Sequence, residues 1–312
     1  MSEQSERRAS TGSASPGTGG DYDPEAIAVR DAATVMILAG DDDPHVLMLK
    51  RNARSIFVGD MWVYPGGAVD PHDATALADA TVSGLTGAEA SYQIGIDRGG
   101  IAFWVAALRE TFEEAGILLA HHDDPAGVED LRDLPSGIID LSPPDVTARF
   151  SGYRDQVNAG TRDFIETVRS EDLLLDGNDV HFIGRWVTPM GPPRRYDTRF
   201  FLTAMPDGQV PLADNDEAVD HQWVRPADAI RRNESGDMVM MTPTIGMLHR
   251  LARFSTIADA VAAAARGTPA DDEHVRIRFD NEGPNRIAFP GDLDYDSADG
   301  RIETGILRWP SQ

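Results

Sequence analysis

Apolar and polar residues alternate along the chain with periods that change from segment to segment. Two short apolar runs, "AATVMILAG" and "HVLMLKR", flank the acidic stretch "DDDP", which predicts a β-hairpin with an acidic turn. A third strand, "MWVYPGGAVD", is interrupted by Pro65-Gly66-Gly67. The main chain at such a tripeptide must turn sharply or approach a ligand closely, so this break is a candidate part of a binding site.

A helix is predicted after a loop-rich insertion at residues 70–99, in which we expect one short helix. The apolar stripe of the main helix comprises Ile101, Val105, Leu108 and Phe112. Gly116 is placed to end it, because glycine is common just after the last helical residue. A helical segment at 143–176 contains two further predicted helices, "PPDVTARFSGYRDQV" and "TRDFIETVRSEDLLL".

Strands are predicted next at "DVHFIGRWVTP", "RYDTRFFLTAM" and "AVDHQWVRP". Helices follow at "PADAIRRN", "TPTIGMLHRLARF" and "STIADAVAAAARG", where proline or serine marks the start and glycine ends the last one. Short strands are expected at "HVRIRF" and "RIAFP". This order of elements predicts an α+β fold, with a mixed β-sheet and helices on its faces.

Three regions are expected along the chain. Residues 1–26 are rich in Ser, Gly, Thr and Pro, which predicts a disordered leader. Residues 27–266 form the main domain, and residues 267–312 form a small acidic C-terminal extension. No apolar run approaches the ~20 residues of a membrane span. The N-terminus also lacks the apolar centre of a secretory signal, so we expect a cytoplasmic protein.

Charge and composition exclude several classes of function. The formal net charge of −24 repels nucleic acid and anionic membranes, so a phosphate-containing ligand must meet local cations. Those cations are almost all arginines, since Lys50 is the single lysine, and arginine suits bidentate contact with phosphate. The absence of cysteine excludes disulfides, thiolate metal sites and cysteine nucleophiles.

The segment "LRETFEEAGILLA" concentrates three carboxylates near the C-terminal end of the main helix. Glu110, Glu113 and Glu114 are three or four positions apart and share one face, away from the apolar stripe. A solvated acidic face is the simplest interpretation. However, a helix C-terminus disfavours negative charge, and Arg109 is the only adjacent counter-charge in this segment. A divalent cation such as Mg²⁺ or Mn²⁺, which prefers oxygen ligands, would cancel the repulsion.

These residues resemble the signature of the nudix hydrolases, G-x5-E-x7-R-E-U-x-E-E-x-G-U, in which U is apolar. Gly67 and the run "RETFEEAGI" at 109–117 fit it, except that Thr111 replaces an apolar residue. The first glutamate of this nudix box would fall at Ile101. Glu89, in the insertion, is a candidate replacement as the ion-pair partner of Arg109.

The spacing within the box narrows the resemblance. Arg109 follows Gly67 by 42 positions, about 28 more than the compact pattern has, so the 70–99 insertion lies inside the box. A long insertion there is typical of the nineteen-type group of nudix hydrolases, a coenzyme A diphosphatase branch. The segments "RDAATVMIL", "VYPGGAVD" and "DNDEAVDHQWVRPADAI" are also similar to that group, so the resemblance covers roughly residues 30–250 and implies a nudix α/β/α sandwich.

The resemblance implies metal-dependent hydrolysis of a nucleoside diphosphate-linked substrate, with coenzyme A or acyl-coenzyme A favoured. The coenzyme A motif of bacterial relatives is kept only in part, at Leu47, Arg51 and the Pro-Gly-Gly turn. Hydrolysis of ADP-ribose or of a nucleotide sugar is therefore an alternative. An alternative of another class is a non-catalytic nudix-fold protein that binds a ligand.

The same resemblance implies roles for individual residues. The metal ligands are expected to be Glu110, Glu113, Glu114 and the main-chain carbonyl of Gly67. Glu110 is also a candidate catalytic base, and Arg109 is expected to orient the glutamates. Glu217, in "DNDEAVDHQW", is a candidate fourth catalytic carboxylate, with competitors at Asp214, Asp216 and Asp220.

Candidate substrate-binding residues follow from the chemistry of a diphosphate and a nucleobase. The candidates for phosphate contacts are Arg51, Arg54, Arg195 and Arg199. Tyr64 is a candidate for stacking on a base. Surface ion pairs and a core aromatic are the alternative interpretations of the same residues. The expected partner is a small-molecule diphosphate rather than nucleic acid or a membrane, and a homodimer is left open.

Overall fold

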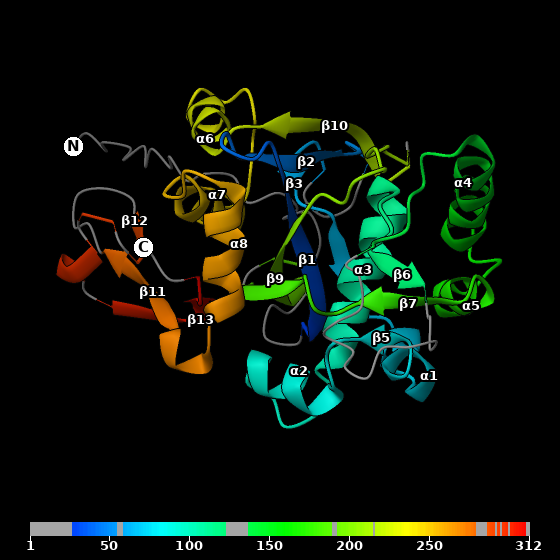
Figure 1. The fold of residues 1–312 in the computed structure, drawn as a ribbon. Coiled ribbons are helices and arrows are strands. Elements are labelled where there is room, and N and C mark those ends of the chain that lie inside the picture. Colours follow the sequence, from blue (N-terminus) through cyan, green and yellow to red (C-terminus); the bar gives the residue numbers. More distant parts are fainter. Residues whose placement is uncertain are drawn as a thin grey trace, which may run out of the picture.

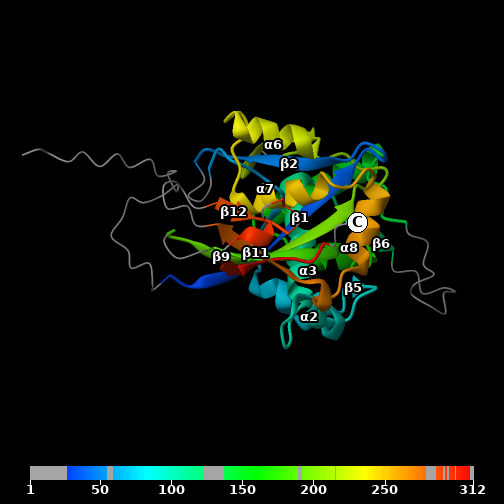
Figure 2. The same cartoon turned by 90° about the vertical axis from the view of Figure 1, so that its left-hand side faces the viewer.

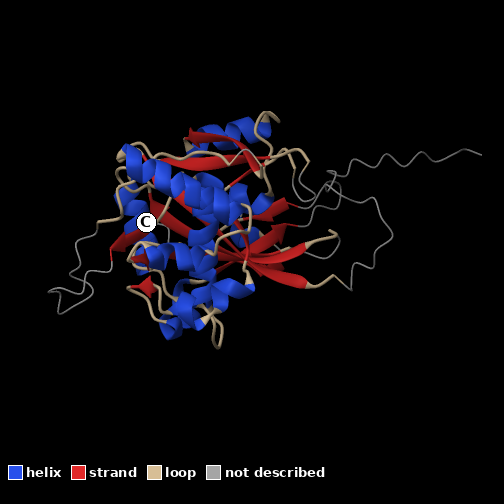
Figure 3. Ribbon diagram, turned by 90° about the vertical axis from the view of Figure 1, so that its right-hand side faces the viewer, coloured by secondary structure: helices blue, strands red, loops and turns tan. Residues whose placement is uncertain are grey.

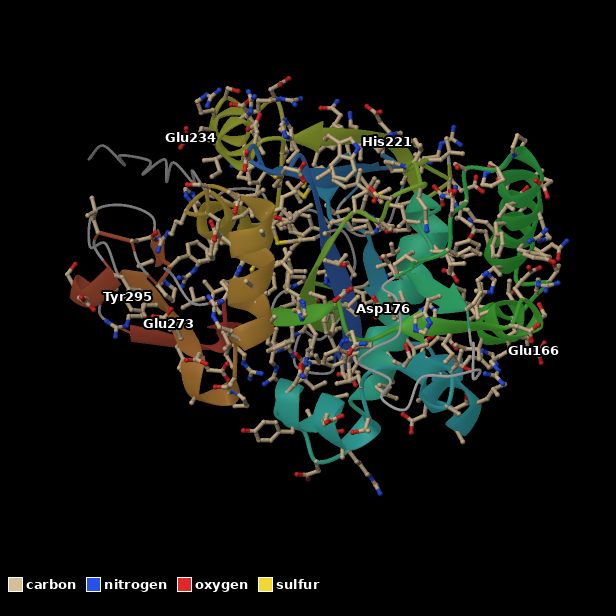
Figure 4. The ribbon with its side chains drawn as sticks, viewed as in Figure 1. Glu166, Asp176, His221, Glu234, Glu273 and Tyr295 are labelled. Carbon is tan, nitrogen blue, oxygen red and sulfur yellow. The ribbon has the colours of Figure 1, made fainter. Side chains whose placement is uncertain are left out.

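The computed structural model describes residues 27–54, 59–122, 137–188, 192–214, 216–278, 286–290, 292–293, 295–298 and 300–309. The predicted leader at 1–26 lies outside the described residues. Figure 1 shows helices on both sides of a central sheet. Glu166 on α5 (Phe164–Ser170) and Glu273 on β11 (Glu273–Arg278) mark two opposite sides of the molecule (Figure 4).

The central sheet has ten strands among the described residues, in the order β10-β2-β1-β9-β8-β13-β11-β12, with β3 paired to β2 and β4 to β1. They are β1 (Val29–Ala39), β2 (His45–Arg51), β3 (Trp62–Val63), β4 (Gly66–Ala68), β8 (His181–Val187), β9 (Arg195–Ala204), β10 (Ala218–Val224), β11, β12 (Arg286–Ala288) and β13 (Gly300–Leu307). β1 and β9 are parallel and the other pairs are antiparallel, so the sheet is mixed as predicted.

The parallel pair begins where Val29 lies beside Arg195. Figure 2 and Figure 3 show these first residues of β1 and β9 projecting past the helices on one side of the molecule. β1 and β2 form the hairpin expected around the acidic turn.

Successive residues of β1 face opposite layers of the fold. Val35 and Ile37 pack with residues of α3 (Ile101–Ala115). Met36 and Leu38 pack with residues of α7 (Thr242–Leu251) and α8 (Ile257–Arg266). All four side chains are fully buried, so β1 is apolar on both faces, as a strand between two helical layers must be. The predicted α/β/α sandwich is confirmed.

Most helices form where the sequence predicts them. α3 ends at Ala115, and Gly116 adopts a left-handed φ of 69° and donates to the carbonyl oxygen of Phe112. The remaining predicted helices are α4 (Pro144–Asn158), α5, α6 (Pro226–Glu234), α7 and α8. α5 is shorter than expected, because the apolar residues after it form β7 (Leu173–Asp176), and α8 is capped by Thr256 rather than by serine.

The insertion at 70–99 contains more structure than the single short helix expected there. It holds the 3-10 helix η1 (Pro71–Ala74), α1 (Ala76–Asp79), β5 (Val82–Ser83) and α2 (Gly87–Ile94). β5 joins β7 and β6 (Ala120–His122) in a small second sheet. These pieces are too short for a period to be recognised, but side-chain caps begin each helix, at Asp70, Thr75 and Thr86.

The C-terminal region extends the central sheet. The expected strands "HVRIRF" and "RIAFP" form β11 and β12, and β13, which was not predicted, pairs with β8 and β11. Trp309 is fully buried, stacks on Phe254, and donates its indole N–H to the carbonyl oxygen of Ala260 on α8. Within the described part of the chain, no helix combines the length and the apolar character that crossing a membrane requires.

Candidate active site

The Pro65-Gly66-Gly67 turn lies against the C-terminal half of α3. β1 fixes the turn, because two of its donors bind the carbonyl oxygen of Pro65. The Glu110 carboxylate lies close against Gly67, since a Cβ at position 67 would come within 2.4 Å of it and the side chain would have to move. Gly66 N donates to Glu114 Oε2 at 2.9 Å, which holds this buried carboxylate against the turn.

Arg109 connects the insertion to the glutamates of α3. Its Nε and Nη2 donate to the two carboxylate oxygens of Asp73 at 2.9 and 3.0 Å. Its Nη1 donates to Glu110 Oε1 and to Glu113 Oε2, each at 2.9 Å. Asp73 is only 1% exposed, so water screens this ion pair weakly.

The expectation that Glu89 pairs with Arg109 was wrong. The Glu89 carboxylate accepts hydrogen bonds from the main-chain N–H and the hydroxyl of Thr86, where it completes a capping box at the start of α2. Asp73 is the ion-pair partner of Arg109 instead, because η1 lies against α3. The run "DPHD" at 70–73 predicts a helix start, but nothing in the sequence shows that this start lies beside α3.

Burial and mutual repulsion raise the pKa values of the box glutamates. The pKa of Glu110 rises to about 7, mainly through burial, with further contributions from Glu113 and Glu217 that Arg109 opposes. Burial, followed by the charge of Glu110, raises the pKa of Glu114 well above its ordinary value. Burial also raises the pKa of Glu113. The arginines therefore compensate only part of the negative charge at this end of α3.

Arg51, at the end of β2, lies between Glu114 and Glu217. Its Nη1 is 3.7 Å from Glu114 Oε1, its Nη2 is 3.3 Å from Glu217 Oε2, and its Nε is buried with no hydrogen-bond partner among the residues that the structure describes. The Glu217 side chain is 64% exposed, and Asn52 N donates to its carbonyl oxygen. Asp214, one of the competitors, instead accepts hydrogen bonds from the main chain of its own loop. The structure thus brings Glu217 to the box glutamates.

These groups line a pocket of about 780 Å³. β1, β3, β4, β8, β9, α4 and the start of α7 also contribute to its lining. The acidic lining consists of Glu110, Glu113, Glu114, Asp214, Asp216 and Glu217. The apolar lining includes Trp186, Phe200, Met241 and Pro243. One cavity therefore offers carboxylates and an apolar surface together.

The other predicted substrate-binding residues lie in different environments. Arg54 is exposed and lines the pocket. Arg195 is outside the pocket lining, and its Nε donates to the carbonyl oxygen of Thr188. Tyr64 lines the pocket, but the residue is only 3% exposed and its hydroxyl donates to the carbonyl oxygen of Thr244 at 3.0 Å. Tyr64 therefore fixes the start of α7 and leaves little surface for stacking on a base.

Arg199 does not reach the pocket, in contrast to its predicted phosphate contact. Its side chain is 3% exposed, forms an ion pair with Asp197, and lies over the ring of Phe103. Asp197 also accepts two hydrogen bonds from Arg185. A side chain with these partners stabilises the layer between β9 and α3 and has no free surface for a ligand.

Comparison with known families identifies the group to which this site belongs. The family model for the NUDT19 Nudix domain matches residues 29–251. The chain belongs to this family. Its members in other organisms include the acyl-coenzyme A diphosphatase NUDT19 of Gallus gallus, which is 29% identical over 266 residues and covers 74% of this chain and 70% of its own length. The protein of the same name from Homo sapiens is 27% identical over 271 residues, with the same coverage.

A solved structure is similar to about three quarters of this chain. The NUDIX hydrolase of Alicyclobacillus acidocaldarius is 26% identical and superposes with a TM-score of 0.56, covering 76% of this chain and 97% of that protein. The recognised nudix box and the α/β/α sandwich are thus confirmed, and the chain is a nudix hydrolase.

Nudix hydrolases generally use divalent metal ions, and the donor set of this NUDT19-type site fits one. Several carboxylates with raised pKa values lie beside a main-chain turn, and hard cations prefer such oxygen ligands. Among the described residues, however, no three acidic or histidine side chains converge as a ready metal site. In this structure Arg109 and Arg51 contact the carboxylates.

Two residues of α4 were not predicted to take part in this site. Arg154 Nε and Asn158 Nδ2 both donate to the main-chain carbonyl oxygen of Glu113, at 2.9 and 3.2 Å, and Asn158 also lines the pocket. The sequence predicts the helix that carries them. It does not show which face of that helix packs on α3, because α4 is weakly amphipathic and has a largely polar surface.

Proposed function

We propose that this nudix hydrolase cleaves the diphosphate bond of coenzyme A or acyl-coenzyme A with the help of Mg²⁺ or Mn²⁺. The observation that carries the proposal is the cluster of Glu110, Glu113 and Glu114 beside Gly67, in a pocket that is also lined by apolar side chains. Relatives named acyl-coenzyme A diphosphatase, which match most of the chain, support the choice of substrate.

Glu110, Glu113, Glu114 and the carbonyl oxygen of Gly67 would hold the metal. A bound divalent ion stabilises charge on the diphosphate oxygens and lowers the pKa of a water molecule. Arg109 keeps Glu110 and Glu113 close together despite their repulsion, because one of its nitrogens donates to both. Its own position depends on the buried Asp73.

Glu217 is the residue we assign as general base. Its carboxylate is exposed at the pocket and can accept a proton from a water molecule there. Glu110, the other candidate, is buried and already accepts a hydrogen bond from Arg109, which favours a role as ligand.

Arg51 is suited to bind the substrate phosphates. Its present partners, Glu114 and Glu217, lie at the loose separations of 3.7 and 3.3 Å, and within the described part of the chain its Nε has no partner. A guanidinium released from these carboxylates can form charge-assisted hydrogen bonds with phosphate oxygens.

The rest of the pocket suits the organic part of such a substrate. Its volume of about 780 Å³ lies within the roughly 300–1,000 Å³ of small-molecule pockets. Trp186, Phe200, Met241 and Pro243 offer an apolar surface to a pantetheine or acyl chain. The net charge of −24 supports a small molecule over nucleic acid.

Hydrolysis in ¹⁸O-labelled water tests the proposal. The full chain and Mg²⁺ are incubated with one compound at a time: coenzyme A, an acyl-coenzyme A, ADP-ribose or a dinucleoside polyphosphate. The masses of the products are then measured by mass spectrometry. We expect an adenosine bisphosphate and a phosphopantetheine, one of which carries a single ¹⁸O atom from water. Hydrolysis of ADP-ribose alone, or of none of the compounds, would contradict the assignment.

A further inference from the structure

The C-terminal end of α3 is held by a residue outside the nudix box. Arg154 of α4 is 7% exposed, and its Nε donates to the main-chain carbonyl oxygen of Glu113 at 2.9 Å. Its Nη1 lies over Gly116, where a Cβ would come within 3.1 Å of that nitrogen. The glycine of the box therefore ends the helix and also leaves room for an arginine.

The contact satisfies a main-chain group that the helix itself leaves free. The last four carbonyl groups of a helix have no partner within it. The carbonyl of Phe112 accepts from Gly116 N, and that of Ala115 accepts from Leu212 N. The carbonyl of Glu113 accepts from Arg154 and Asn158, so α4 fixes the peptide group that joins Glu113 to Glu114.

The positive charge of Arg154 lies at the C-terminal end of α3. The C-terminal end of a helix carries partial negative charge, and a cation there is favourable. Burial lowers the pKa of Arg154, and the charges of Asp214, Asp155 and Glu114 oppose that shift. The Nη2 of Arg154 is buried without a partner among the described residues, so the guanidinium retains a free donor.

We propose that Arg154 is a positioning residue that sets the main chain beneath Glu113 and Glu114 and so pre-organises the carboxylates for a divalent cation. Through Arg154 the helix α4, which lies outside the nudix box, supports the proposed metal site. The inference rests on the metal site of the proposed function, but it does not depend on which diphosphate is the substrate.

Calorimetric titration of Mn²⁺ into the metal-free full chain tests this role without any substrate. We expect Arg154→Met to keep the far-UV circular dichroism and the cooperative unfolding of the parent, and to lose about tenfold or more in Mn²⁺ affinity, the usual effect of removing a group that orients metal ligands. At saturating Mn²⁺, kcat is expected to fall while KM changes little, since Arg154 does not line the pocket.

Arg149→Met is the matched control on the same helix. Arg149 is 42% exposed and pairs with Glu171, away from the glutamates of α3, so this variant is expected to bind Mn²⁺ as the parent does. If Arg154→Met does not fold, Arg154→Lys replaces it, because lysine keeps the charge but cannot reproduce the guanidinium contacts. That variant is expected to lose several-fold in Mn²⁺ affinity.

An Mn²⁺ affinity equal to that of the parent, in either folded Arg154 variant, would overturn the proposal. A parent that binds no Mn²⁺ would overturn it as well. A parent that binds Mn²⁺ but leaves every coenzyme A compound intact would contradict the proposed substrate alone, and the comparison of the Arg154 variants would still decide this inference.

Discussion

Asp73 and Arg109 form a two-point ion pair across 36 positions of sequence, with Nε–Oδ1 and Nη2–Oδ2 distances of 2.9 and 3.0 Å. The box lacks its first glutamate, since Ile101 occupies that place and is buried in the core. The insertion that separates the two halves of the box therefore supplies the missing carboxylate. A segment that interrupts the motif in sequence completes it in space.

Asp73→Asn tests this replacement. The substitution removes the two-point partner of a mostly buried arginine and leaves it only the single contacts to Glu110 and Glu113, so we expect a loss of about 3 kcal/mol in the free energy of unfolding. Hydrolysis should also fall by at least tenfold, because Arg109 no longer holds Glu110 and Glu113 in place. Urea unfolding and steady-state kinetics of the full chain measure the two effects.

Glu89→Gln is the control for that experiment. Glutamine can keep the capping box with Thr86, so stability should change by less than about 1 kcal/mol and activity should match the parent. If Glu89→Gln lost activity as Asp73→Asn is expected to, the pairing of Arg109 described here would be wrong.

Substrate binding should depend on Arg51 and not on Arg195. Loss of a charge-assisted contact to phosphate costs about 1.5 kcal/mol or more, so we expect Arg51→Met to raise KM about tenfold. Arg195→Met removes a hydrogen bond to Thr188 outside the pocket lining and should change KM by less than about twofold. Equal KM values for the two variants would contradict the placement of the phosphates near β2.

Without metal, the folded protein should hold a proton at Glu110 up to near-neutral pH. Its pKa of about 7 when folded lies above the ordinary value of 4.5, so the folded state binds this proton more tightly than the unfolded state does. The resulting stabilisation is complete below pH 4.5 and is lost as the pH rises through 7.

The comparison of the parent with Glu110→Gln in a chelating buffer isolates this effect, because glutamine does not titrate. Between pH 4.5 and pH 8, the free energy of unfolding of the parent should fall by about 3 kcal/mol relative to that of Glu110→Gln. A difference that is independent of pH would show that Glu110 is not desolvated in the folded protein.

Trp309→Ala tests the contribution of the C-terminal region to the stability of the nudix fold. Trp309 is fully buried between Phe254 and α8, and truncation of such a side chain typically costs 3–5 kcal/mol. Leu293→Ala, at an exposed position, is the control and should unfold at the same urea concentration as the parent. If the two variants were equally stable, the region after α8 would not support the domain.

The sequence predicted long elements well and short ones poorly. β1, β2 and α3 carry periods long enough to be recognised, and Gly116 and the Pro-Gly-Gly turn mark their limits. β5, β6 and β7 span two to four residues each, and they form because the small sheet pairs them across distant parts of the chain. The pattern of apolar and polar residues within such a short segment does not show which distant strand it will pair with.

The same distinction applies to the site. Glu110, Glu113 and Glu114 could be proposed as ligands because they share one helix face, and Gly67 because it ends the Pro-Gly-Gly turn of the nudix signature. Asp73 and Arg154 were not identifiable, since both reach α3 from separate elements through tertiary packing. Arg199 was misassigned because charge suggests a ligand contact, whereas burial beside Asp197 decides its role.

The most direct test of the account is a titration of Mn²⁺ into the metal-free parent and into Glu114→Gln. Glutamine keeps the size of this buried side chain and can still accept the hydrogen bond from Gly66, so the fold should be intact. We predict that the parent binds Mn²⁺, that Glu114→Gln binds it at least tenfold more weakly, and that the variant does not hydrolyse acyl-coenzyme A. Equal Mn²⁺ binding and equal turnover by the two proteins would contradict the claim that these glutamates form a metal site for diphosphate hydrolysis.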